Sequence, residues 1–237
     1  LAAHNDSILL NRALFARISS LYQQRETLTM DAESSRLLQQ YYVDFVRAGA
    51  ALESDQQQRL REINAELAVL RTQFSQNVLS EVNAMAIVVD SREELTGLDE
   101  ATITAAGEEA IKRDLAGKYV IPLRNTSGQP ALASLQNRSL RERMHRTSLS
   151  RGSHGGEFDN REILSKVLRL RSERAQLLGY ETHADYILED QTAQSVAAVN
   201  RRLAELAPPA AANARREAAA LQQMIEEEGG DFELASW

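Results

Sequence analysis

The stretch LREINAELAVLRTQF, residues 60–74, decides the fold because its apolar residues recur in alternating steps of three and four. The repeating positions are Leu60, Ile63, Leu67, Leu70 and Phe74. This spacing is typical of a helix that buries one narrow stripe against a neighbouring helix. The pattern therefore predicts a long helix that begins near Ser54 and forms part of an antiparallel coiled-coil hairpin.

Further helical patterns lie on both sides of this seam. Asn11 and Asp31 are good N-caps for helices over 12–25 and up to Gly49, since short polar side chains cap helix starts and glycine ends helices. More helices are predicted over 99–115, over 135–152, from Asp159 or Asn160 onward, and from about 195 to 229. Pro208–Pro209 is expected to break or kink the last one, because each proline removes a backbone donor.

Two apolar, β-branched segments interrupt the helices: AMAIVVD (84–90) and GKYVIPLRNTSGQPAL (117–132). Pro122 restricts the second to an edge strand. The predicted fold class is mainly α, a multi-helical lobe with long antiparallel helices and a small β-hairpin or sheet insertion. One lobe is expected to cover residues 1–237, with a small β-containing subregion at 84–135.

The composition of the 237 residues excludes several classes of protein. There is no cysteine, so disulfides and thiolate metal sites are excluded. The net charge of -7 argues against general affinity for nucleic acid or an anionic membrane. No apolar run reaches the roughly 18 residues that a membrane helix needs. We expect a cytoplasmic protein, with a periplasmic location left open.

The sequence carries no recognisable catalytic apparatus. The histidines are His4, His145, His154 and His183, and no two have the spacing of a His-Glu-x-x-His zinc helix. A Gly-x-Ser-x-Gly elbow and the phosphate-binding glycine motifs are also absent. We therefore assign no catalytic residue and no metal ligand to this chain.

Two segments still invite a functional interpretation. RGSHGGEFDN (151–160) places three glycines before a helix start, where a backbone can approach an anion, and Arg151 and His154 are its candidate side chains. A flexible loop between helices is the competing interpretation. In LLGYETHADYILED (177–190), His183 follows Thr182, a plausible N-cap. This favours a structural histidine that satisfies a local backbone group over a metal ligand.

Several long stretches resemble one family of enzymes. They are HNDSILLNRALFARI (4–18), YYVDFVRAGAAL (41–52), LREINAELAVLRTQFSQNVL (60–79), YVIPLRNTSGQPALASLQNRSLRERMHRTSLSRG (119–152) and DNREILSKVLRLRSERAQLLGYETHADYILEDQTA (159–193). The chain resembles the zinc metallopeptidases of the thimet oligopeptidase and oligopeptidase A group. Within this group, the sequence resembles the bacterial peptidyl-dipeptidases most. These enzymes, also called dipeptidyl carboxypeptidases, remove dipeptides from peptide C-termini.

The resemblance implies a mostly helical body split by a deep channel with zinc at its floor. The family's zinc ligands and catalytic residues lie beyond the part that this sequence matches. The chain is therefore expected to be an internal fragment, inactive alone, with zinc held elsewhere in the full-length parent. Arg151 and His154 become candidates for the channel wall. The implied partners are short peptides and the catalytic lobe of the same parent chain, with no nucleic acid and no membrane.

A stand-alone α-helical interaction module without catalysis is the alternative function. Residues 141–174 carry nine Lys or Arg against five acids, which leaves a nucleic-acid binder as a third interpretation. The overall acidity and the scarcity of aromatic residues count against that third interpretation.

Overall fold

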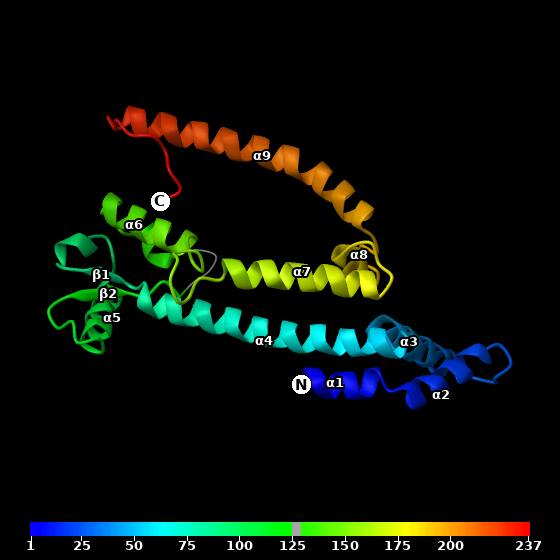
Figure 1. The fold of residues 1–237 in the computed structure, drawn as a ribbon. Helices are drawn as coiled ribbons and strands as arrows, with labels where there is room; N and C mark the ends of the chain where they lie inside the picture. The colour runs from blue at the N-terminus through cyan, green and yellow to red at the C-terminus, as the bar shows by residue number, and fades with distance from the viewer. Residues whose placement is uncertain (125–128) are drawn as a thin grey trace. The chain divides into compact units, whose positions relative to one another are not determined.

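The computed structural model describes residues 1–124 and 129–237, and helices dominate it (Figure 1). In chain order the elements are α1 (Ala2–Leu9), α2 (Arg12–Gln23), α3 (Ala32–Ala48), α4 (Ser54–Ala84), β1 (Ile87–Val89), η1 (Glu93–Leu95), α5 (Glu100–Ile111), β2 (Tyr119–Ile121), η2 (Pro130–Ala133), α6 (Arg138–Leu149), α7 (Arg161–Leu177), α8 (His183–Leu188) and α9 (Val196–Glu227). The predicted mainly α class with a small sheet is confirmed. The NTSG part of the quoted segment 117–132 lies outside the described residues.

The chain forms two compact units, each assembled from separate segments. The first unit contains residues 1–73 and 163–203, and the second contains residues 74–162 and 204–237. The long helices α4 and α9 contribute residues to both units. A single lobe over 1–237, with a β-containing subregion at 84–135, stays a prediction.

The core of the first unit is the predicted seam of α4 packed against α7. Its buried residues are Ile63, Leu67, Leu70, Ile163, Val167 and Leu170. The two helices run in opposite directions (Figure 1). Arg59 of α4 fixes their alignment, because its Nε and Nη2 donate to the two carboxylate oxygens of Glu173 at 2.6 and 2.9 Å. The predicted long antiparallel helices are therefore present, but β1, α5, β2 and α6 separate α4 from α7 in the chain, so the two do not form a hairpin.

Local capping sets the ends of α2 and α3. The side chains of Asn11 and Asp31 accept hydrogen bonds from amides of the first turns they precede, at 3.0 and 2.6 Å. Gly49 ends α3 in the left-handed region at φ 99°, and a Cβ there would lie 2.5 Å from Cδ2 of Leu60. Tyr22 and Tyr42 stack at 3.9 Å between ring centroids and join the two helices.

The second unit packs its helices around a two-stranded antiparallel sheet. Ile87 pairs with Ile121 and Val89 with Tyr119, and β2 ends immediately before Pro122. This agrees with a proline that cannot continue a ladder. The core residues are Ile87, Val89, Leu95, Ile103, Ala106, Ile121, Leu123, Leu135, Leu140 and Met144.

Two elements depart from the sequence predictions. The short helix α1 was not predicted, because none of its residues is buried and no side chain caps its start. A break or a kink was predicted at Pro208–Pro209, and the break is wrong, since α9 continues through both prolines. No residue of α9 is buried, so water can bond to the carbonyl groups that lose a donor. Neither α9 nor any other helix of the described ranges is both long and apolar enough to cross a bilayer.

Candidate functional site

The glycine-rich segment between α6 and α7 forms a loop within the second unit. Gly152, Gly155 and Gly156 have φ values of 73°, 81° and 83°, which residues with a Cβ rarely adopt. The amide of Gly152 donates to the carboxylate of Glu81, and that of Gly155 donates to Oδ2 of Asp159 at 2.8 Å. The loop backbone does approach anions, but these anions are the protein's own side chains.

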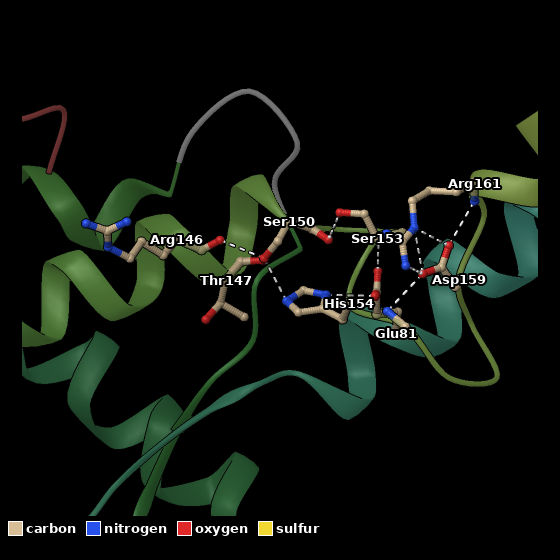
Figure 2. A network of polar contacts seen from close by, with 10 residues as sticks. Glu81, Arg146, Thr147, Ser150, Ser153, His154, Asp159 and Arg161 are labelled. Atoms are coloured by element: carbon tan, nitrogen blue, oxygen red, sulfur yellow. Dashed lines mark hydrogen bonds and ion pairs between the residues drawn. The ribbon is translucent and has the colours of Figure 1, made fainter.

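Glu81 of α4 is the centre of this loop site (Figure 2). The residue is only 4% exposed. One carboxylate oxygen accepts the Gly152 amide, and the other lies 2.9 Å from Nδ1 of His154. A carboxylate buried without partners would be costly, so both hydrogen bonds hold the loop against α4.

The second ring nitrogen of His154 contacts Ser150 at the end of α6. Nε2 lies 2.7 Å from Oγ of Ser150, and that hydroxyl also lies 2.8 Å from the carbonyl oxygen of Arg146. The hydroxyl can donate to the carbonyl and accept from Nε2, or it can donate to Nε2. His154 is therefore held at both ring nitrogens, by Glu81 and by Ser150.

The order Ser150, His154 and Glu81 is that of a nucleophile, a base and an orienting carboxylate. The surroundings do not suit such chemistry. The adjacent cavity has a volume of about 10 Å³, lined by Glu81, Val82, Met85, Leu123, Thr147, Arg151 and His154. A cavity of that size holds about one water molecule and no peptide. Ser150 does not line this cavity, and its contact with His154 helps to position the loop.

Arg151 and His154, the two residues predicted from the sequence, contribute to the same cavity. Nη2 of Arg151 donates to the carbonyl oxygen of Leu123 at 2.7 Å, close to the end of β2. The structure thus brings both side chains together with Glu81. Contact of either residue with a peptide stays a prediction.

Two asparagines anchor the other end of the loop, and neither was proposed as a site residue. Nδ2 of Asn77 donates to Oδ1 of Asn160 at 3.0 Å, and Nδ2 of Asn160 donates to the carbonyl oxygen of Phe74 at 3.1 Å. The sequence did contain a pattern that points to the polar residues of α4 at this site. Continuing the three-four spacing of α4 beyond Phe74 leads to Asn77 and Glu81, polar residues at positions that face inward.

Asp159 closes the loop through local bonds. Its carboxylate accepts from the backbone amide and the guanidinium of Arg161, at 2.9 and 2.6 Å. These bonds to Arg161 hold the pKa of Asp159 far below its usual range. The carboxylate therefore stays ionised and keeps the start of α7 fixed.

The joint between α7 and α8 has the geometry of a structural turn. Gly179 adopts φ 87° after α7, and Thr182 caps α8 in a reciprocal capping box with Asp185. His183 is the first residue of α8, as predicted. The expected local bond is wrong for one ring nitrogen, since Nδ1 is buried with no hydrogen-bond partner among the described residues.

His183 gives a testable pH dependence. Burial, followed by the charges of Arg174, Arg171 and Arg71, lowers its pKa below the ordinary 6.5. The folded state therefore binds fewer protons than the unfolded state near that pH, so stability falls as the pH drops through about 6.5. We expect the free energy of unfolding to fall less between pH 7.5 and 5.5 in His183→Gln than in the wild type. Equal slopes in urea titrations would contradict this.

No group of three or more His, Asp or Glu side chains in residues 1–124 and 129–237 could hold a metal ion. Glu81 and His154 supply only two potential ligands, and both already bind partners inside the protein. A tetrahedral zinc site needs three protein ligands plus water, or four protein ligands. The described residues therefore do not fit zinc.

Comparisons with known proteins extend over the whole chain. Residues 131–237 match the model of Peptidase family M3. The dipeptidyl carboxypeptidase of Salmonella typhimurium is 37% identical over all 237 residues, and that of Escherichia coli is 35% identical over the same length. Oligopeptidase A of Haemophilus influenzae is 31% identical over 231 residues. The chain spans 35%, 35% and 34% of the lengths of these three relatives.

Proposed function

Because this chain belongs to peptidase family M3, we propose that it forms a non-catalytic helical lobe of a zinc-dependent peptidyl-dipeptidase or oligopeptidase. In this role it lines a channel that admits short peptides and excludes folded proteins. The observation that carries the proposal is the similarity to a dipeptidyl carboxypeptidase along every part of the chain, which covers only 35% of that relative. Catalysis then belongs to the remainder of the complete enzyme.

An exposed apolar stripe on α9 supports a docking role toward the rest of such an enzyme. Four large side chains repeat on one side of the helix and are each about half exposed: Leu203 (57%), Leu206 (48%), Leu221 (48%) and Met224 (53%). None of the residues of α9 is buried. Exposed apolar side chains that repeat on one side of a helix mark a surface that a partner covers. We propose that the catalytic lobe covers it.

The residues present indicate which part of the complete enzyme would supply the zinc chemistry and which part would position the peptide. Zinc, when bound in the complete enzyme, supplies an activated water for peptide hydrolysis. The described residues do not fit zinc, so its ligands would come from outside this chain. The chain itself contributes rigid helices and the loop held by Glu81, near which Arg151 and His154 would face the channel. Positioning a peptide and excluding water are contributions to catalysis in their own right.

Peptide hydrolysis tests the proposed function. The product of the complete gene is expected to release C-terminal dipeptides from N-acetylated tetrapeptides and to lose this activity with a zinc chelator. The 237-residue chain alone is expected to release none. A C-terminally amidated tetrapeptide is the control that separates dipeptidyl carboxypeptidase from endopeptidase action. A complete gene product without zinc-dependent hydrolysis would contradict the proposal and favour the stand-alone helical interaction module.

A further inference from the structure

Three arginines and one histidine form a basic cluster in the first unit. Arg71 follows the core residue Leu70 on α4, and Arg171 follows the core residue Leu170 on α7. Arg174 lies one turn further along α7, and His183 begins α8. All three guanidinium groups lie close enough to the imidazole for their charges to lower its pKa. None of the ion pairs between described residues includes Arg71, Arg171 or Arg174.

Three polar atoms of this basic cluster are buried and have no hydrogen-bond partner among the described residues. They are Nε of Arg171, Nε of Arg174 and Nδ1 of His183. Buried donors in native proteins are nearly always satisfied, and an orphaned charged donor is costly. Burial and the neighbouring positive charges also lower the pKa of Arg174. The cluster therefore concentrates positive charge, and within the described part of the chain no acceptor bonds to these three atoms.

Arg47 is an arginine of the same unit whose charge is balanced by carboxylates. Its guanidinium lies 4.9 Å from the ring centre of Tyr186, and that of Arg174 lies 5.3 Å from the same ring. Arg47 forms ion pairs with Glu189 and Asp190. No described carboxylate does the same for Arg174. Of the two arginines beside this ring, Arg47 is thus paired with two carboxylates, whereas no carboxylate of residues 1–124 and 129–237 pairs with Arg174.

We propose that Arg71, Arg171, Arg174 and His183 form a binding site for a small oxyanion, either a carboxylate group of a peptide or a phosphate group. Arg171 and Arg174 are three residues apart and therefore share one face of α7. A planar guanidinium presents two parallel N–H groups, which match the oxygen pair of a carboxylate or phosphate. A protonated His183 would add a further donor from α8. The site is independent of the proposed peptidase function, and failure of one leaves the other standing.

Thermal unfolding of the 237-residue chain tests the site with three probes. Inorganic phosphate is compared with chloride at matched ionic strength, so that general screening cancels. An N-acetylated dipeptide is compared with its C-terminal amide, which lacks the carboxylate. A rise in Tm with phosphate alone identifies a phosphate site. A rise with the dipeptide acid but not with the amide identifies a carboxylate site.

Charge-removing variants locate the site. Arg171→Gln and Arg174→Gln are each expected to weaken anion binding roughly tenfold or more, as loss of a charge-assisted hydrogen bond requires. Arg169→Gln is the matched control, since it removes the same charge from an exposed position of the same helix. If the α7 variants do not fold, Arg71→Gln tests the exposed edge of the cluster and is expected to weaken binding in the same direction.

Anion binding should also protonate His183, because a bound negative charge offsets the three arginines. The chemical shifts of its ring are therefore expected to move toward those of the charged form when the anion is added at neutral pH. The proposal is overturned if none of the probes raises Tm beyond its control. It is equally overturned if Arg169→Gln reduces binding as much as Arg171→Gln.

Discussion

Replacement of Ile63 by alanine is expected to lower the free energy of unfolding by about 3 kcal/mol. Ile63 is 0% exposed and lies in the apolar core that joins α4 to α7. Truncation removes buried methyl and methylene groups and leaves a cavity that the two long helices can fill only in part. Urea unfolding followed by circular dichroism measures the loss directly.

Val69→Ala is the matched control for Ile63→Ala. Val69 belongs to the same helix and also carries a β-branched side chain, but it is 65% exposed. Its truncation is expected to change the free energy of unfolding by about 0.5 kcal/mol or less. Similar losses in the two variants would show that the seam of α4 does not form the core between the helices.

Replacement of Glu81 by leucine is expected to cost about 3 kcal/mol, because two hydrogen-bond donors lose their charged acceptor. The amide of Gly152 and Nδ1 of His154 would both remain near an apolar side chain. The loop 150–160 would then detach from α4, and trypsin is expected to cleave after Arg151 faster than in the wild type. Unfolding in urea and limited proteolysis provide the two measurements.

Glu81→Gln separates shape from charge at this position. The amide oxygen can still accept from Gly152, so the expected cost is about 1 kcal/mol. Glu66→Leu serves as the control for the charge change, since Glu66 is an exposed residue of the same helix. A Glu81→Leu variant as stable as Glu66→Leu would show that the buried carboxylate does not hold the loop.

The helices could be predicted well where their signals are local. Asn11, Asp31, Asp99 and Thr182 each cap the helix that follows them, and a cap depends only on neighbouring amides. The apolar seam of α4 likewise appears in the sequence at fixed spacing. By contrast, α1 lacks both a capping side chain and a buried face. The sequence of α1 therefore contains no pattern from which a helix could be predicted.

The candidate site was predicted less completely than the fold. Arg151 and His154 were found because glycines and a helix start surround them in the sequence. Glu81 was missed because its partners lie 71 and 73 residues further along the chain. Only the inward position of a charged residue on α4 pointed to it. Pairing across such a distance depends on the packing of whole elements and cannot be inferred from local chemistry.

The helix α4 contributes residues to both compact units. Its first part buries leucine and isoleucine in the first unit, and its last turns present Asn77 and Glu81 to the loop of the second unit. One continuous inward stripe thus changes from apolar packing to polar anchoring. This supports the proposal of a lobe that holds a loop in a defined place beside a peptide channel.

Hydrogen exchange of α9 tests the central proposal most directly. In the 237-residue chain, the amides around Leu203 to Met224 are expected to exchange quickly, because no residue of this helix is buried. In the product of the complete gene, the same amides are expected to exchange more slowly, since the catalytic lobe would cover the apolar stripe. Equal exchange of α9 in both proteins would contradict the proposal that this chain is a docked lobe of an M3 peptidase.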